Sequence, residues 1–365
     1  MLIFLVVLFV LILVHEWGHF IVAKKTGMRV DEFGIGFPPK LYGIKKGGTE
    51  YTINALPIGG FVRIFGEDAA DAEHDAAEGR DVSGAFSSKS KWAQVAVLLA
   101  GVTMNILFAW ALIAFVYLIG VPSAIDEKDV TPYSSLIVTE VVSGSPAAEA
   151  HIPVGAKILR YGAKNAYTDM TPTAFREYTL QQGTSPLSIT YEVGKEETTV
   201  AVTPKTGLIS DEPNQPAIGV ALSVVATVHK PLVEALTDAT VTTYQTLTGI
   251  AVGLGTLLIA IAHLHADLSQ VAGPVGIVGM VGQAAEFGFA SLLMFTAVIS
   301  LNLAVINLLP FPALDGGRLL FVIIETLTRR RLDPTWVARI NATGFALLIA
   351  LMIAVTYSDI AKLLR

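Results

Sequence analysis

The sequence predicts a polytopic α-helical membrane protein with four transmembrane helices, a membrane-associated β-sheet loop and one extracytoplasmic α+β domain. Mean hydropathy is +0.59, and only 15% of the 365 residues are charged. Four apolar segments are each near the ~20 residues that a helix needs to cross a bilayer. The chain has no cysteine, which excludes disulfides and thiolate metal sites. The formal net charge of −6 and the absence of a basic aromatic stripe argue against nucleic acid as a partner.

The placement of lysine and arginine predicts how these spans are oriented. Residues 24–91 carry ten Lys and Arg and the short stretch 318–339 carries five, whereas 121–289 carries eight against sixteen Asp and Glu. Cytoplasmic loops carry an excess of Lys and Arg. We therefore expect 24–91 and 311–340 to be cytoplasmic, and both chain termini and 121–289 to be extracytoplasmic. The predicted spans are about 2–23, 92–119, 290–310 and 341–360.

A fifth apolar run, LTGIAVGLGTLLIAIA at 247–262, competes with the count of four. If this run crossed the membrane once, the three arginines at 329–331 would lie outside, against the charge rule. We therefore expect a helix that lies in the outer interface, or that dips into the membrane and returns. Its glycines would allow close packing against another span.

The first span contains the pentapeptide HEWGH, directly after fourteen apolar residues. A charged side chain at the bilayer centre costs roughly 2.5–3.5 kcal/mol on insertion scales, so a function is expected for it. His15 and His19 are four residues apart and share one helix face. In the HExxH pattern the two imidazoles bind zinc and the glutamate, here Glu16, is the general base on water. A cleaved signal peptide is the alternative, but no basic region precedes Leu2 and no small-x-small cleavage site precedes His15.

Asp315 is the best candidate for a third zinc ligand. Catalytic zinc takes three protein ligands and keeps an open position, and in a chain without cysteine the third must be His, Asp or Glu. At ~1.5 Å per residue, His15 lies about 20 Å from residue 2, inside the membrane and nearer its cytoplasmic face. Asp315, in NLLPFPALDGGR, follows the inward third span and reaches a similar depth. The alternatives are a span-ending turn capped by LDGG, and Glu325 as the third ligand instead.

These motifs resemble the site-2 protease family of intramembrane zinc metalloproteases, in the overall order of its bacterial regulator-of-sigma-E protease branch. HEWGH and NLLPFPALDGG carry the resemblance, and PIGGFVRIFGE, GSPAAEAHIPVGAKIL and GPVGI follow in the family's order over nearly the whole chain. The resemblance implies one Zn²⁺ per chain, bound by His15, His19 and Asp315, with Glu16 activating water. It also implies that Asn307 holds substrate, for which a helix cap is the alternative.

By this resemblance the chain is expected to be an endopeptidase of regulated intramembrane proteolysis in the bacterial inner (cytoplasmic) membrane, with its active site toward the cytoplasm. The expected partners are the lipid bilayer and single-span membrane proteins, either anti-sigma-factor-like or signal-peptide remnants, which are cut within or near the transmembrane segment. A non-enzymatic membrane scaffold with a structural zinc is the remaining alternative, although such a site normally has four protein ligands.

The chain departs from the family pattern in two segments. AGVTMN has Val102 where the family has proline, which leaves open the role of Asn105. The segment that resembles a PDZ domain has His151 where glycine is common and Ala156 where aspartate often follows glycine. These two departures affect the expected peptide binding of the domain more than its expected fold. One PDZ-like domain, about 134–205, is expected, either to dock a carboxyl terminus or to exclude substrates with large outer domains.

Residues 30–66 are predicted to form short strands with tight turns, because they alternate in places and are punctuated by Gly and Pro. An exposed sheet edge beside the active site would hold an unwound substrate as a strand, and a plain cytoplasmic hairpin is the alternative. The stretch 67–81, with seven acids, predicts a mobile linker or a covering flap. His263 and His265 could suggest a second metal site, but an interfacial helix end is favoured.

The predicted organisation in chain order is a first transmembrane helix with HEWGH (1–30), a cytoplasmic-side β-loop (31–66), an acidic linker (67–91), a second transmembrane helix (92–120), the PDZ-like domain (134–205), an extracytoplasmic or interfacial region (206–289), a third transmembrane helix with LDG (290–318) and a fourth transmembrane helix (341–361).

Overall fold

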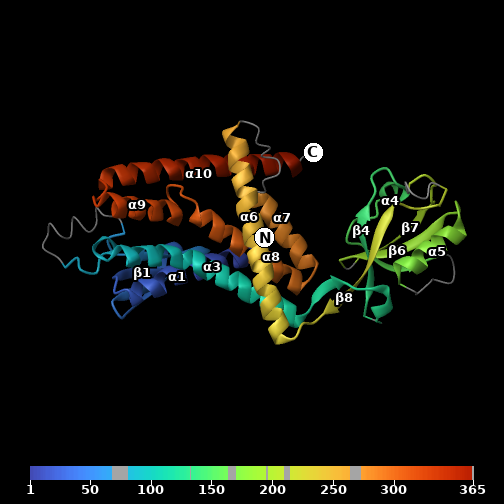
Figure 1. Cartoon of the computed structure of the whole chain (residues 1–365), viewed down its shortest axis with the longest axis horizontal. Coiled ribbons are helices and arrows are strands. Elements are labelled where there is room, and N and C mark those ends of the chain that lie inside the picture. The colour runs from blue at the N-terminus through green and yellow to red at the C-terminus, as the bar shows by residue number, and fades with distance from the viewer. Residues whose placement is uncertain are drawn as a thin grey trace. The chain divides into compact units, whose positions relative to one another are not determined.

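The computed structural model of the chain divides into two compact units (Figure 1). The first unit combines Met1–Phe115 with Val233–Arg365, and the second is Val116–Leu232. The first unit is mostly helical, and the second is built on a β-sheet. The structure describes residues 1–67, 81–131, 133–162, 170–194, 196–208, 214–263 and 273–363.

The first unit contains the long apolar helices that the sequence predicts. Within the described residues, five helices are long and apolar enough to cross a membrane: α1, α3, α6, α8 and α10. Four of them correspond to the four predicted spans, and α6 is the additional one. The helices of this unit are α1 (Leu2–Lys25), α3 (Lys91–Ile119), α6 (Leu232–Ala262), α7 (Pro274–Glu286), α8 (Phe289–Leu308), α9 (Asp315–Thr328) and α10 (Pro334–Leu363).

The prediction of four spans is not confirmed by length and composition alone, because α6 also qualifies. The apolar run at 247–262 is the second half of this helix, whose first half is richer in Thr and contains two acidic residues. Figure 1 shows α6 running across the direction of α3 and α10. Its most apolar 18-residue window is only 6% buried, against 33% for α1.

Residues 30–64 form the predicted β-loop beside α1. Strands β1 (Val30–Lys46) and β2 (Thr49–Ile64) are long, antiparallel and bent. Phe33 in β1 is opposite both Tyr51 and Val62, so the first half of β1 lies between the two halves of β2. The second half of β2 is therefore an outer row of the sheet, and it lies against α1.

The acidic linker predicted at 67–91 is described only in part, and residues 68–80, including His74, lie outside the described residues. The described end of this segment packs beneath the β-loop. Phe86, in a 3-10 turn at Phe86–Ser88, is buried, and its N–H donates to Phe65 O over 2.8 Å. Arg29 N–H likewise donates to Gly84 O over 2.8 Å. This described part is thus anchored to the end of β2.

The second unit has one six-stranded antiparallel sheet, in the order β3-β8-β4-β5-β6-β7, with a core centred on Tyr161, Phe175 and Ile189. The last strand in sequence, β8, lies between β3 and β4. The folded unit therefore extends on both sides of the predicted range 134–205, because β3 and β8 fall outside it. The elements are β3 (Val121–Ala124), β4 (Ser135–Val141), α4 (Pro146–Glu149), β5 (Lys157–Tyr161), α5 (Pro172–Gln182), β6 (Leu187–Val193), β7 (Glu196–Val202) and β8 (Val220–Val228).

The GPVGI segment begins α7 and is joined to the last helix. Asp359 of α10 is 4% exposed, and its Oδ2 accepts the N–H of Gly276 over 2.8 Å. A Cβ on Gly273 would lie 2.7 Å from the same carboxylate oxygen. The first N–H groups of a helix have no partner within the helix, so a side chain of α10 supplies one for α7.

Candidate metal centre

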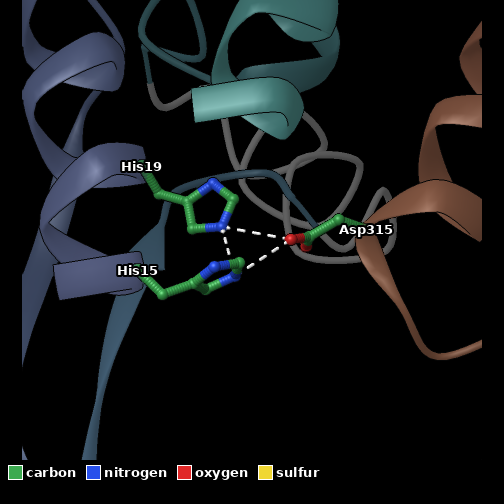
Figure 2. A group of neighbouring side chains, drawn as sticks. All are labelled: His15, His19 and Asp315. Atoms are coloured by element: carbon green, nitrogen blue, oxygen red, sulfur yellow. Dashed lines mark hydrogen bonds and ion pairs between the residues drawn. The ribbon is translucent and has the colours of Figure 1, made fainter. Parts of the chain in front are cut away.

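Three predicted ligands meet within the first unit. His15 and His19 are buried on one face of α1, and Asp315 is the first residue of α9 (Figure 2). Asp315 Oδ2 is 3.0 Å from His15 Nε2 and 3.3 Å from His19 Nε2, and the two Nε2 atoms are 3.1 Å apart. The imidazole rings are nearly perpendicular, with an interplanar angle of 79°. Residues 300 positions apart in the sequence thus direct three ligand atoms at one point.

Asp315 is placed by an irregular loop between α8 and α9. The prolines at 310 and 312 prevent α8 from continuing, and the chain turns at Ala313, whose φ is +73°. The two glycines after Asp315 pack tightly on this loop: a Cβ on Gly316 would lie 2.2 Å from Leu309 O, and one on Gly317 would lie 2.2 Å from Phe311 O. The LDGG sequence therefore lets α9 begin in contact with the turn that precedes it.

The last helix supports the same loop from the other side. Asn341 Oδ1 on α10 accepts the N–H of Ala313 over 3.3 Å. A Cβ on Gly344, also on α10, would lie 2.5 Å from the Pro312 Cβ. Irregular backbone at membrane depth persists where protein buries it and supplies hydrogen-bond partners. Thus α10 helps to position Asp315 although it supplies no ligand.

The donor set fits a zinc ion. His19 Nδ1 is 2.8 Å from Val97 O, which can only accept a hydrogen bond, so Nδ1 carries the proton and the Nε2 of a neutral ring carries a lone pair. In a neutral ring that lone pair faces a carboxylate oxygen, so a proton or a metal ion between the two atoms is needed to offset their repulsion. Ligand atoms around a tetrahedral zinc ion with bonds of about 2.0–2.1 Å lie about 3.3 Å apart. The three separations here, 3.0, 3.1 and 3.3 Å, are close to that spacing.

Glu16, between the two ligands in sequence, contacts the β-loop. Its Oε2 accepts the backbone N–H of Val62 over 2.9 Å. The close approach of β2 to α1 favours glycine at position 59, because the φ there is +127° and a Cβ would lie 2.8 Å from the end of the Ile12 side chain one turn earlier in α1. The outer row of the sheet therefore touches the carboxylate that the sequence predicts as the general base.

The alternative third ligand, Glu325, is placed away from the histidines. It forms an ion pair with Lys91, and its Oε1 accepts Leu332 N–H over 2.9 Å. Among the described residues, the cluster at the histidines offers three ligands, His15, His19 and Asp315. The structure thus argues against Glu325 as a ligand, and the cluster offers three candidate protein ligands where a structural zinc site normally has four.

Two other predicted residues lie apart from this cluster. Asn307 is half-buried in the last turn of α8, and within the described part of the chain its side chain makes no hydrogen bond. The alternative role as a helix cap is therefore not seen, since the residue belongs to the helix itself, and its role in holding substrate stays a prediction. His263 is exposed directly after α6, and His265 lies outside the described residues.

Peptidase family M50 matches residues 3–351 of the chain. The chain belongs to this family, the site-2 proteases. A Clostridium perfringens relative whose name includes the words zinc metalloprotease is 36% identical over 351 residues, or 96% of this chain and 95% of the relative. The regulator of sigma-W protease RasP of Bacillus subtilis is 28% identical over 435 residues, or 99% of this chain and 98% of the relative. The predicted family and the prediction of a metalloprotease are thereby confirmed.

Site-2 protease membership and several long apolar helices together identify a membrane protease. Among solved structures, the PDZ domain of the SdrC-like protein from Listeria monocytogenes matches 26% of this chain and 92% of its own length, with 21% identity and a TM-score of 0.22.

Of the residues that surround the predicted ligands, the sequence singled out Asn105 without assigning its role, and it did not indicate the others. Val97 and Asn105 contact the two imidazoles, Val62 contacts Glu16, and Asn341 holds the loop before Asp315. For α3 the sequence did contain a signal. Val97, Gly101 and Asn105 recur at intervals of four residues, which is also the interval between His15 and His19. For Val62 and Asn341 there was no comparable signal, since one contact uses backbone and the other depends on how α10 packs.

Replacing Gly101 on α3 tests how closely this helix backs the site. A Cβ there would lie 2.3 Å from His19 Nε2 and 2.6 Å from His15 Cε1. We expect Gly101→Ala to displace both imidazoles and to weaken zinc binding at least tenfold, although alanine in place of glycine favours a helix by about 1 kcal/mol. The measurement is zinc affinity by chelator competition. Gly249→Ala is the matched control, because a Cβ at Gly249 on α6 meets no atom within 4 Å; equal affinities in the two variants would contradict the prediction.

Proposed function

We propose that the chain is an intramembrane zinc endopeptidase that cuts single-span membrane proteins within or near their transmembrane segment. The observation that carries this proposal is the convergence of two imidazoles from an apolar helix with one carboxylate from a distant helix, with atom separations of 3.0–3.3 Å. Zinc is the metal in the names of the relatives. Three protein ligands and an adjacent glutamate are the composition of a catalytic zinc site.

In the proposed reaction His15, His19 and Asp315 hold the metal, which when bound supplies a Lewis acid for the scissile carbonyl and for water. Glu16 takes a proton from the attacking water and returns it to the leaving amine nitrogen, so that the peptide bond breaks and no net proton is consumed in the transfer. The N–H of Val62 holds one carboxylate oxygen of Glu16, which leaves the other oxygen to accept the proton.

The β-loop is proposed to present the substrate as a strand. In a helical substrate every peptide bond within the helix is covered by hydrogen bonds, so the segment must unwind before it can be cut. The outer row of β2, residues 59–64, lies against α1 beside Glu16. An exposed sheet edge pairs with an extended peptide through main-chain hydrogen bonds. This row is therefore in the right place to bind an unwound segment next to the metal site.

We further propose four spans, with α6 in or near the outer interface and both termini extracytoplasmic. The crosswise direction of α6 in Figure 1 and its exposed apolar surface support this arrangement. The basic segments 24–91 and 318–339 then share the cytoplasmic side, as the charge rule requires. In this orientation the metal site lies toward the cytoplasmic face of the bacterial inner membrane.

The second unit is proposed to contact the part of the substrate outside the membrane. A groove of about 350 Å³ lies between α5 and residues 216–222, with Phe175 and Leu222 among its apolar lining and Arg176 among its polar lining. This groove favours docking of a peptide segment over exclusion by size alone. By analogy with the B. subtilis relative named for sigma-W, an anti-sigma-factor-like protein is the proposed substrate class.

The experiment uses the purified full-length protein in detergent with a tagged single-span substrate, and it counts bound zinc in the same preparation. We expect about one zinc per chain, and cleavage within or near the apolar segment of the substrate, located by mass spectrometry. Cleavage that maps only to soluble tails would contradict an intramembrane site. A preparation that is folded but binds no zinc would contradict the metal centre itself.

A further inference from the structure

The face of α3 that meets the metal site has three contacts in a regular row. Val97, Gly101 and Asn105 are four residues apart, so they lie on one face of α3. His15 and His19 are four residues apart on α1, and the two rows face each other. Val97 O is 2.8 Å from His19 Nδ1, and the Asn105 carboxamide is 3.3 Å from His15 Nδ1. Each imidazole is thus contacted by α3 at the nitrogen that faces away from Asp315.

Glycine at 101 makes this contact possible. The imidazoles lie so close to α3 that a Cβ at this position would fall 2.3 Å from His19 Nε2. On the facing helix, a Cβ on Gly18 would lie 2.5 Å from Ala100 O. Paired glycines let two helix backbones approach more closely than larger residues allow. The close approach brings a main-chain carbonyl of α3, Val97 O, within reach of a side chain on α1.

Of the three residues in this row, Asn105 is the one whose side chain can present either a donor or an acceptor to the imidazole. Asn105 is completely buried, and its Oδ1 has no hydrogen-bond partner within the described residues. A half-turn of the carboxamide exchanges its oxygen and its nitrogen. With Oδ1 directed at His15, the oxygen accepts a hydrogen bond from Nδ1–H, and the Nε2 lone pair is directed at Asp315. His15 then has the same tautomer that Val97 O imposes on His19.

We infer that Asn105 is a positioning residue for the metal, which fixes the tautomer and ring orientation of His15 by accepting a hydrogen bond from its Nδ1. Metal-binding histidines commonly donate their second N–H to such an oxygen, and the loss of this partner typically costs about 10- to 100-fold in affinity or activity. Asn105 and Val97 together make both imidazoles ready to bind a metal before it arrives. The inference rests on the proposed zinc site.

The test measures zinc affinity, by competition with a chelating dye, for the purified full-length protein and three variants. We expect Asn105→Leu, which keeps the volume but removes the acceptor, to bind zinc about 10- to 100-fold more weakly. Asn105→Asp keeps an acceptor at the same place, and we expect an affinity within a few-fold of wild type. Gln94→Leu is the matched control: it removes a buried carboxamide from the same helix, one that contacts Lys89 O and no histidine.

A role in packing alone predicts a different pattern. Wild-type affinity in Asn105→Leu, an equal loss in Asn105→Asp, or an equal loss in Gln94→Leu would each overturn the inference. Thermal unfolding of the zinc-free variants shows whether the fold is retained, and Asn105→Ala replaces Asn105→Leu if the latter does not fold. A wild-type protein that binds no zinc would contradict the proposed function, whereas a zinc site that is indifferent to Asn105 contradicts only this inference.

Discussion

Glu16→Gln is expected to abolish measurable proteolysis while the protein keeps its zinc. The glutamine amide has the size of the carboxylate, and its oxygen can still accept the N–H of Val62 that Glu16 holds over 2.9 Å. It cannot take a proton from water, and general-base catalysis is typically worth about 10²- to 10⁴-fold in rate. We expect a loss of this size in the cleavage rate, measured with a tagged single-span substrate, and about one zinc per chain in both proteins.

Glu50→Gln is the matched control, because Glu50 lies on the same β-loop and forms an ion pair with Lys40 away from the histidines. We expect this variant to cleave at nearly the wild-type rate. If Glu16→Gln retained full activity, Glu16 would not be the base. If it lost both activity and zinc, the change would have disturbed the ligands, and the loss of rate could not be assigned to proton transfer.

The second large effect is expected for Asp315→Ala, which removes one of three ligand atoms. Its Oδ2 lies 3.0 Å from His15 Nε2 and 3.3 Å from His19 Nε2, and in the described part of the chain no other carboxylate joins this cluster. We expect zinc affinity to fall by more than the about 10- to 100-fold that is typical of an outer partner, and proteolysis to be lost with it. Metal content after dialysis and chelator competition are the measurements.

Glu325→Ala is the control for this variant, since Glu325 is the other acidic residue that the sequence offers as a third ligand. The structure pairs it with Lys91, so we expect the zinc content of Glu325→Ala to equal that of the wild type. A protein that loses zinc in Glu325→Ala but keeps it in Asp315→Ala would contradict the site as described.

The three candidate ligands could be predicted from sequence because each follows from a local rule. Helical spacing alone puts His15 and His19 on one face, and counting residues along two spans brings Asp315 to the same depth. The surroundings of the ligands depend instead on how α1 and α3 pack. That Gly18 meets Ala100 and Gly101 meets the imidazoles is decided by the register of two helices, which no single segment encodes.

The same distinction between local rules and tertiary packing explains which features of the fold could be predicted from the sequence. Turn residues and alternation indicate strands over 30–66, but the pairing of Phe33 with both Tyr51 and Val62 is a tertiary outcome. The predicted range 134–205 of the PDZ-like domain leaves out β3 and β8, because β8 follows β7 only after a long stretch of sequence and pairs between β3 and β4. The first half of α6 is too polar to be recognised as an apolar segment. The sequence therefore predicted only the second half of this helix, residues 247–262.

The proposed metal site joins the two ends of the first unit, with two candidate ligands on α1 and the third on α9, held in place by α10. A separated or unfolded chain therefore cannot offer all three ligands at once. By mass action, an ion that binds only the assembled state stabilises that state by RT ln(1 + [Zn]/Kd), or about 2.7 kcal/mol at a hundredfold excess over Kd. Zinc supply would then set the stability of the assembled helices as well as the activity of the enzyme.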